Sequence, residues 1–401
     1  MELFYFGSVC SNEVFNRTVA ESRVKPSASA QNFEYALMKG FSADPTVRVT
    51  AVSAESIAAF PGGNRLLLRR RKDVLTPQIT TRILSAVNLP GIKNIGHARG
   101  AVAQFKKWWR AHKDDADKAV LLYGLYPAVA AALLKVCRRC GCPIYAVITD
   151  VPSTMFTYTK SKNVIKRLFS GSYRQKAVEL QGQFDGYVYL TEAMAEEVAP
   201  GKPYTVVETI ADTTIFDGVD TWTKAEPPAL MYAGALYQKY GVDRIVDAFE
   251  QMQTDCRLWL FGSGDYEEEI RRRAAKNPRI RFFGRVSREE VLRKEREATL
   301  LLNVRDAQDV YTRYSFPSKM IEYMLSGTPL FTSKLPGIPS EYDAYCFTTT
   351  DTDPSALAQQ MDAVLADADL PARGERARAF VLEHKNAQVQ AKKIIDFLRQ
   401  F

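Results

Sequence analysis

Serine, lysine and glutamate side chains lie close together in the stretch Ser315–Pro329, which reads S-F-P-S-K-M-I-E-Y-M-L-S-G-T-P. Ser318 is of a type that caps helix N-termini, and Lys319 and Glu322 then share one face of the predicted helix. Free amides and the positive dipole end at a helix N-terminus suit phosphate, and a carboxylate one turn further accepts hydrogen bonds from sugar hydroxyls. Recognition of a sugar nucleotide requires this combination, although an ordinary surface helix with a weak ion pair also explains it.

Two glycine-containing loops follow predicted strands in the second half of the chain. In the first loop, Gly234 permits a ligand to approach the backbone closely, and Lys239 is placed to neutralise a pyrophosphate. In the second loop, Gly262 and Gly264 form a G-x-G between a strand and a helix, which also suits an approaching ligand. A plain strand-to-helix turn with a surface lysine, and a simple tight turn, are the alternatives.

A third loop, Gly284-Arg285-Val286-Ser287, follows another predicted strand. We expect the backbone at Arg285 and Val286 to contact the edge of a nucleobase. Ser287 is expected to cap the next helix, and capping alone accounts for this serine without any ligand.

Short apolar runs alternate with helical patterns along the whole chain, which is typical of parallel sheets covered by helices. Two sets of such runs predict an α/β fold with two doubly wound domains. The expected strands are residues 3–6, 47–52, 119–123, 144–148, 186–190 and 204–207, then 229–232, 258–261, 280–283, 300–303, 330–332 and 345–348. Helices are expected over residues 242–252, 266–275, 288–297 and 354–366.

The predicted domain boundary lies in the polar stretch Asp212–Pro228. We expect an N-terminal domain over residues 1–211, a C-terminal domain over 212–386, and a terminal helix over 387–401 that crosses back onto the N-terminal domain. Ligands of such sheets bind beyond the carboxyl ends of the strands, so the expected site is a cleft between the domains.

Length and composition fit a two-domain globular protein. The chain has 401 residues, of which 46% are hydrophobic and 25% are charged. Its longest uncharged run, Ala119–Leu134, is shorter than the about 20 residues that a spanning helix needs, so an integral membrane protein is not expected. The start, Met1–Phe6, resembles a buried strand and not a signal peptide. The cysteines of C-R-R-C-G-C lack further ligands at zinc spacing, so we expect reduced thiols and no metal.

The net charge of +8 is concentrated in the first half of the chain. Residues 1–200 hold 27 Lys and Arg against 16 Asp and Glu. Basic residues accompany apolar ones in three stretches there, namely Leu66–Lys72, Phe105–Arg110 and Lys162–Lys176. We expect this surface to meet an anionic membrane face, with Trp at the interface. A solvated basic face is the alternative, and no recognisable module supports nucleic-acid binding.

The ordered motifs Y-A-G-A-L, F-G-S-G-D, F-F-G-R-V-S and F-P-S-K-M-I-E-Y-M-L-S-G-T-P resemble the donor half of retaining glycosyltransferase family 4. These are enzymes of the two-domain GT-B fold that use sugar nucleotides. The following L-P-G-I-P-S-E-Y is similar to members from bacterial capsule, O-antigen and exopolysaccharide gene clusters. The resemblance covers residues 185–350, and the first half only by general pattern.

The resemblance assigns roles to several positions. Glu322 matches the glutamate that binds the nucleotide ribose, and Gly234, Gly262, Gly264, Arg285 and Val286 match the donor loops. The family's first glutamate falls on Tyr314, and its usual arginine and lysine fall on Ala235 and Tyr240. The phosphate clamp is then expected to use Lys239 and Lys319. The family's His-Asp in the first domain is replaced by Thr149-Asp150.

The resemblance implies retaining transfer of a hexosyl unit from a UDP-sugar to a lipid-linked oligosaccharide. Lys239, Lys319 and the amides after Ser318 are expected to stabilise the departing diphosphate without a metal ion or other cofactor. Asp150 is expected to orient the acceptor hydroxyl or stabilise oxocarbenium charge. The implied location is cytoplasmic, on the inner face of the cell membrane. A sugar-nucleotide epimerase and a non-catalytic subunit of the same fold are the alternatives.

Overall fold

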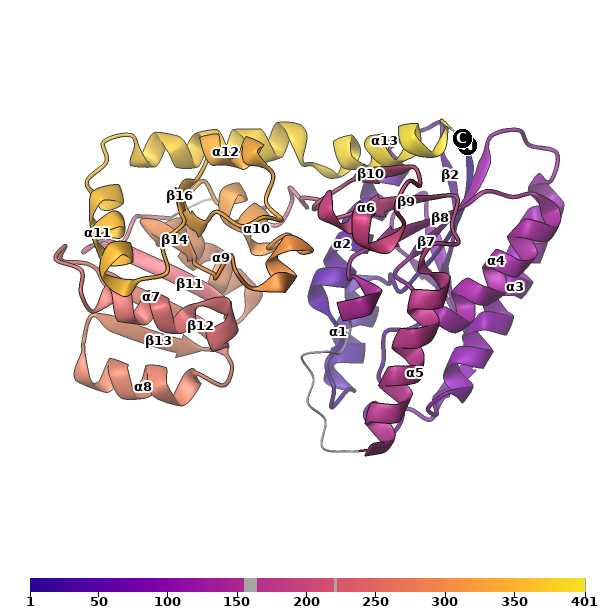
Figure 1. The fold of residues 1–401 in the computed structure, drawn as a ribbon, viewed down its shortest axis with the longest axis horizontal. Helices are drawn as coiled ribbons and strands as arrows, with labels where there is room; N and C mark the ends of the chain where they lie inside the picture. The colour runs from indigo at the N-terminus through magenta and orange to yellow at the C-terminus, as the bar shows by residue number, and fades with distance from the viewer. Residues whose placement is uncertain (155–163, 220–221, 401) are drawn as a thin grey trace. The chain divides into compact units, whose positions relative to one another are not determined.

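The computed structural model describes residues 1–154, 164–219 and 222–400. The chain divides into two compact units, one of Met1–Ile210 with Ala387–Phe401 and one of Ala211–Asn386. Each unit is a largely or wholly parallel sheet covered by helices (Figure 1). The two sheets have the two-domain, Rossmann-like organisation of the GT-B fold, as the sequence predicted.

Unit 1 contains an eight-stranded sheet in the order β10-β9-β8-β7-β1-β2-β5-β4, in which only β4 runs antiparallel to its neighbour. The central strands are buried along nearly their whole length because helices cover both faces, which explains their continuous apolar runs. The strands are β1 (Glu2–Gly7), β2 (Arg48–Ser53), β4 (Arg71–Val74), β5 (Thr80–Ile83), β7 (Lys118–Tyr123), β8 (Ile144–Ile148), β9 (Gly186–Tyr189) and β10 (Tyr204–Val206).

Six of these strands lie where the sequence predicted them, whereas β4 and β5 were not predicted. A separate pair, β3 (Leu67–Leu68) with β6 (Ala86–Val87), was also missed. These strands are short, and charged side chains interrupt their apolar pattern. The helices of unit 1 are α1 (Asn12–Ala20), α2 (Ala28–Ala43), α3 (Ile92–His112), α4 (Pro127–Cys140), α5 (Val164–Gln181), α6 (Ala193–Val198) and α13 (Ala387–Leu398).

Unit 2 contains a six-stranded parallel sheet in the order β13-β12-β11-β14-β15-β16. The chain order reverses direction between β11 and β14, and such a switch point is where open α/β sheets bind ligands. The strands are β11 (Ala229–Ala235), β12 (Arg257–Ser263), β13 (Ile280–Gly284), β14 (Leu300–Asn303), β15 (Leu330–Ser333) and β16 (Phe347–Thr349). The helices are α7 (Val242–Phe249), α8 (Glu267–Lys276), α9 (Arg288–Glu297), α10 (Lys319–Leu325), α11 (Pro354–Leu365) and α12 (Leu370–His384).

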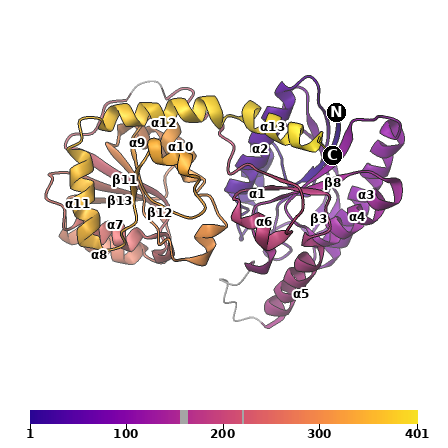
Figure 2. The same ribbon diagram turned by 45° about the horizontal axis from the view of Figure 1, so that its top comes forward.

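Helix α13 follows unit 2 in the chain but packs within unit 1, beside α2 (Figure 2). Its Phe397 ring meets the Tyr145 ring edge-on, with centroids 5.8 Å apart. Gly40 in α2 faces the backbone of Ala387 and the side chain of Ala391, and a Cβ at Gly40 would overlap both. The absence of a side chain at Gly40 therefore sets how closely the two helices approach.

The prediction that the stretch Phe105–Arg110 faces a membrane is wrong for part of that stretch. Phe105 and Trp108 are core residues, with 2% and 4% of their surface exposed, because they pack against Phe4 beneath the sheet. Trp109 is half-buried and stacks on Phe105. In the stretch Lys162–Lys176, residues 162 and 163 and the side chains of residues 164–170 lie outside the described part of the chain. Among the residues described, none of the helices combines the length and the apolarity needed to cross a bilayer.

Replacement of Gly40 by alanine should destabilise unit 1, because the added methyl group forces α13 away from α2. We expect the free energy of unfolding to fall by about 1–3 kcal/mol, as in other overpacked cores. Gly171→Ala in α5 is the matched control, since a Cβ there meets nothing within 4 Å, and it should be neutral or slightly stabilising. Urea titration of the three proteins measures both effects, and equal stabilities would contradict the packing argument.

Candidate functional site

Lys319 and Gly234 meet at the switch point of the unit 2 sheet. Lys319 begins α10, and its Nζ donates a hydrogen bond to the carbonyl oxygen of Ala233, near the carboxyl end of β11. The same ammonium group lies 5.0 Å from the centroid of the Tyr232 ring. A Cβ at Gly234 would occupy the position of the Lys319 Nζ, so only glycine leaves room for this side chain.

Helix α10 is held by its aromatic and apolar side chains and not by a serine cap. Ser318 has helical backbone angles and makes no side-chain capping bond, so the predicted N-cap is wrong. The Met320 amide already donates to the Pro317 carbonyl, which places Ser318 inside the first turn. The buried Tyr323 hydroxyl bonds to both backbone groups of Ala233, at 2.9 Å from the nitrogen and 3.2 Å from the oxygen.

Arg305 is a cation beside Lys319 that the sequence analysis missed. It lies two residues beyond β14, on the other side of the switch point, and its charge helps to lower the pKa of Lys319. Burial is the larger cause, and together they bring the pKa of Lys319 to about 8, against the opposing pull of Glu322. The Arg305 Nε is buried and has no hydrogen-bond partner among the described residues.

Lys239 and Arg305 both lie against one aromatic ring. The Lys239 ammonium group and the Arg305 guanidinium group each lie 5.0 Å from the centroid of the Tyr240 ring. The Tyr311 hydroxyl donates to the Lys239 carbonyl oxygen at 2.8 Å, which fixes the loop after β11. Lys319 and Arg305 therefore lie at the carboxyl ends of β11 and β14, and Lys239 shares the Tyr240 ring with Arg305.

Glu322 faces α9, one turn beyond Lys319. Its Oε2 accepts a hydrogen bond from the Arg288 guanidinium at 3.0 Å, and about a quarter of the glutamate side chain is exposed. The fully buried carboxyl group of Glu295, also on α9, lies next to Glu322 as well. Neither Arg288 nor Glu295 was predicted, although both stand in the helix that follows the G-R-V-S loop.

The remaining predicted donor residues lie at neighbouring loops. A Cβ at Gly262 would overlap the Gly234 carbonyl oxygen and one at Gly264 that of Leu236, so both glycines bring two loops together. The exposed Arg285 donates from Nε to the Ser263 hydroxyl at 2.6 Å. Val286 packs on the core of unit 2, and Tyr314 lies at the end of the 3₁₀ turn Val310–Arg313, beneath the Arg313 guanidinium.

Asp150 belongs to unit 1 and follows β8. Its exposed carboxylate accepts a hydrogen bond from the Thr149 hydroxyl at 3.4 Å. Surrounding protein raises the pKa of Asp150, and the Thr149 bond opposes that rise. Asp150 is thus an exposed acid at the carboxyl end of a parallel strand.

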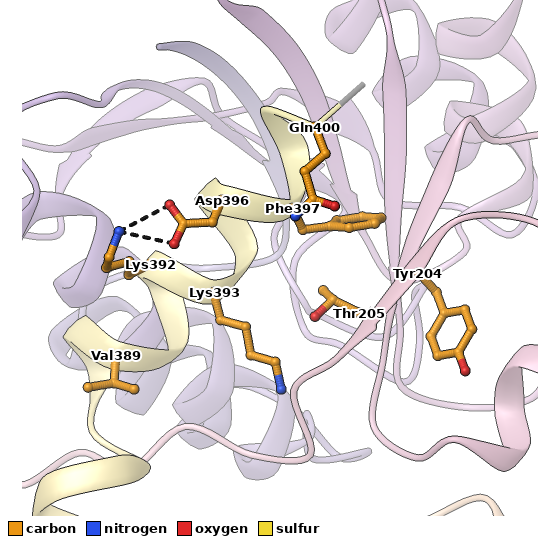
Figure 3. A pocket seen from close by; sticks show the side chains of 8 residues that line it. All are labelled: Tyr204, Thr205, Val389, Lys392, Lys393, Asp396, Phe397 and Gln400. Atoms are coloured by element: carbon orange, nitrogen blue, oxygen red, sulfur yellow. Dashed lines mark hydrogen bonds and ion pairs between the residues drawn. The ribbon is translucent and has the colours of Figure 1, made fainter.

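Two other features of unit 1 do not coincide with predicted sites. A pocket of about 460 Å³ lies beside α13, where Lys392 and Asp396 form an ion pair (Figure 3). Tyr204 and Thr205 of β10 also line this pocket, and none of the predicted site residues does. In the described part of the chain, the one three-residue group with metal-ligand geometry is Glu2, His112 and Asp115, where Arg48 already pairs with Glu2.

Residues 227–367 match the family model described as glycosyl transferases group 1. The fold resembles that of Anabaena HepE, solved with UDP, at a TM-score of 0.62 and 14% identity over 100% of both chains. Sucrose-phosphate synthase from Thermosynechococcus elongatus gives 0.65 at 15% identity over 100% of this chain and 99% of that one. Trehalose 6-phosphate synthase from Burkholderia multivorans gives 0.65 at 13% identity over 100% and 98%. No curated protein sequence matches the chain significantly.

These comparisons and the paired Rossmann-like sheets support a glycosyltransferase of the GT-B fold. The family match covers most of unit 2, including the switch point and α10, but ends before α12. The cationic group described above therefore lies within the part of the chain that resembles known glycosyltransferases most specifically.

Lys319 should titrate with a pKa of about 8 in the ligand-free protein, because burial and Arg305 disfavour its charge. Protein labelled with ¹³C at lysine Cε should show a resonance that titrates near pH 8 and is missing from Lys319→Met, while the resonance of Lys224, whose pKa burial also lowers to about 8, should remain. Exposed lysines titrate above about pH 10 and serve as internal controls. A Lys319 resonance that moves only above pH 10 would contradict the described burial.

Proposed function

We propose that unit 2 binds a nucleoside diphosphate sugar with UDP as the nucleotide, and that the protein transfers the hexosyl unit of this donor with retention of configuration. The convergence of Lys319, Arg305 and Lys239 on the carboxyl ends of β11 and β14 carries this proposal. The solved complexes of HepE with UDP and with UDP-glucose support UDP as the nucleotide. The proposed acceptor is a saccharide or a lipid-linked oligosaccharide. The proposed role is in the synthesis of bacterial surface polysaccharide.

The three cations stabilise the diphosphate leaving group in this proposal. Cleavage of the bond between the sugar and the diphosphate leaves negative charge on the diphosphate oxygens. Lys319 lies in a desolvated position, where its interaction with that charge is stronger than it is in water. Arg305 and Lys239 supply further positive charge, and the backbone amides after Ser318 add hydrogen bonds. These groups neutralise the diphosphate without a metal ion or other cofactor.

We assign the ribose, the base and the sugar of the donor to residues in the loops around the three cations. Glu322 accepts hydrogen bonds from the ribose hydroxyls, and the backbone at Arg285 and Val286 contacts the base. Gly262 and Gly264 keep the loop after β12 close to Gly234, which leaves the phosphate side of the site open to a ligand. Tyr314 is assigned to the sugar side of the donor site.

Asp150 is assigned to the acceptor step. A carboxyl group with a raised pKa suits proton exchange with an acceptor hydroxyl or stabilisation of positive charge on the sugar. Its position after β8 fits the rule that ligands bind beyond the carboxyl ends of parallel strands.

We further propose that unit 1 meets an anionic lipid surface at the inner face of the cell membrane. Exposed apolar side chains gather where β3 pairs with β6 and α3 begins, and they include Leu67 at 62% and Ile95 at 52% exposure. The exposed guanidinium groups of Arg69 and Arg70 flank them. Apolar groups that insert beside basic groups match the chemistry of an anionic bilayer.

Loss of the donor-site charges should weaken UDP binding. Lys319→Ala should raise the Kd for UDP roughly tenfold to a hundredfold, the effect of a hydrogen bond between charged groups, and Glu322→Ala about tenfold. Lys276→Ala and Glu268→Ala, which remove exposed charges on α8, are the matched controls. Calorimetry with UDP measures the affinities, and UDP-sugar hydrolysis measures turnover.

Wild-type affinity in both donor-site variants would contradict the site assignment. Formation of a UDP-sugar isomer without an acceptor would instead indicate an epimerase. Absence of any nucleoside diphosphate binding by the wild-type protein would indicate a non-catalytic subunit.

Sedimentation with vesicles tests the membrane surface. The wild-type protein should sediment with vesicles that contain phosphatidylglycerol and not with pure phosphatidylcholine. Leu67→Glu and the double variant Arg69→Glu with Arg70→Glu should each reduce the bound fraction severalfold, because one loses apolar insertion and the other reverses charge. Val389→Glu, on α13 of the same unit, should bind like the wild type. Equal binding by all four proteins would exclude this surface.

A further inference from the structure

Glu295 is a buried acid that the donor site described above does not explain. It lies near the end of α9 with no exposed surface, and neither of its carboxyl oxygens has a hydrogen-bond partner among the described residues. The carboxyl group of Glu322 lies next to it. A carboxylate that is fully buried beside a second carboxylate, without a hydrogen-bond donor, is strongly disfavoured, so at least one of the two groups must hold a proton.

The surroundings decide which of the two carboxyl groups is protonated. Glu322 is partly exposed and accepts a hydrogen bond from Arg288 at 3.0 Å, so its negative charge is compensated. Burial and the charge of Glu322 raise the pKa of Glu295 well above its usual range, and Lys319 and Arg288 only partly oppose this. The proton therefore resides on Glu295.

The two partners of Glu322 come from one face of α9. Arg288 and Glu295 are seven residues apart, which is two helical turns, so their side chains project in the same direction. Arg288 contacts one oxygen of the Glu322 carboxylate, and Glu295 approaches the same group from the protein interior. Helix α9 thus restrains the carboxylate from two sides.

We propose that Glu295 is a positioning residue that donates a hydrogen bond from its protonated carboxyl group to Glu322 and so orients Glu322 toward the ribose hydroxyls of the donor. This inference rests on the proposed function of Glu322. A carboxylate held in one orientation loses less rotational freedom when the nucleotide binds, which strengthens binding. An apolar side chain in place of this buried acid would fold at least as well, so its orienting role, and not stability, accounts for the acid.

A comparison of UDP with 2′,3′-dideoxy-UDP isolates this effect. The wild-type protein should bind UDP roughly tenfold more tightly than the dideoxy nucleotide, because only UDP offers hydroxyls to Glu322. Glu295→Gln should keep this preference within about twofold, since its amide also donates a hydrogen bond. Glu295→Met should lose most of the preference while its affinity for the dideoxy nucleotide stays within about twofold of wild type. Glu268→Met on α8 is the control and should behave as wild type.

Unfolding in urea separates positioning from a structural role. Glu295→Met should unfold at the same urea concentration as the wild type or a higher one, because it removes a buried polar group without a donor. A structural role predicts instead that Glu295→Met is less stable and binds both nucleotides equally weakly.

The outcomes also distinguish this inference from the proposed function. A wild-type protein that does not bind UDP, or does not prefer it to the dideoxy nucleotide, would overturn the assignment of Glu322. A wild-type preference that persists in Glu295→Met would overturn the role of Glu295 alone.

Discussion

The contact between the Lys319 ammonium group and the Ala233 carbonyl oxygen is the constraint on which the donor site depends. It requires Gly234, because a side chain there would occupy the same space, and it requires α10 to lie against β11. Tyr323 secures that second condition by bonding to the same residue of β11. A cation is thereby held in a desolvated place, where a charged ligand interacts with it more strongly than in water.

Much of the fold could be predicted from the sequence because the central strands are buried on both faces and must be apolar. The strands β8 and β14 have the predicted bounds, and α9 has them too. The strands between Leu67 and Val87 could not be predicted, since short edge strands carry charges and lack a continuous apolar run. Trp108 was misjudged because its basic neighbours face the solvent while its own ring faces the sheet.

Residues of the site could be predicted only where a sequence motif indicates the local backbone geometry. Gly234, Lys319 and Glu322 belong to short segments whose spacing indicates a strand end or a helix face. Arg305 and Glu295 stand in segments without such a pattern, and they reach the site through the strand order and the packing of α9 on α10. The Ser318 cap failed for a local reason, because the preceding Pro317 already accepts the first bond of the turn.

Protonation of Glu295 also affects the total charge of the site. With a neutral Glu295, the cations Lys319, Arg305 and Arg288 face the single carboxylate of Glu322, which leaves an excess of positive charge for a diphosphate. An ionised Glu295 would cancel part of that excess at a position too deeply buried for solvent to screen it. The same proton that orients Glu322 therefore keeps the surroundings of Lys319 electropositive, so positioning and charge balance depend on one buried group.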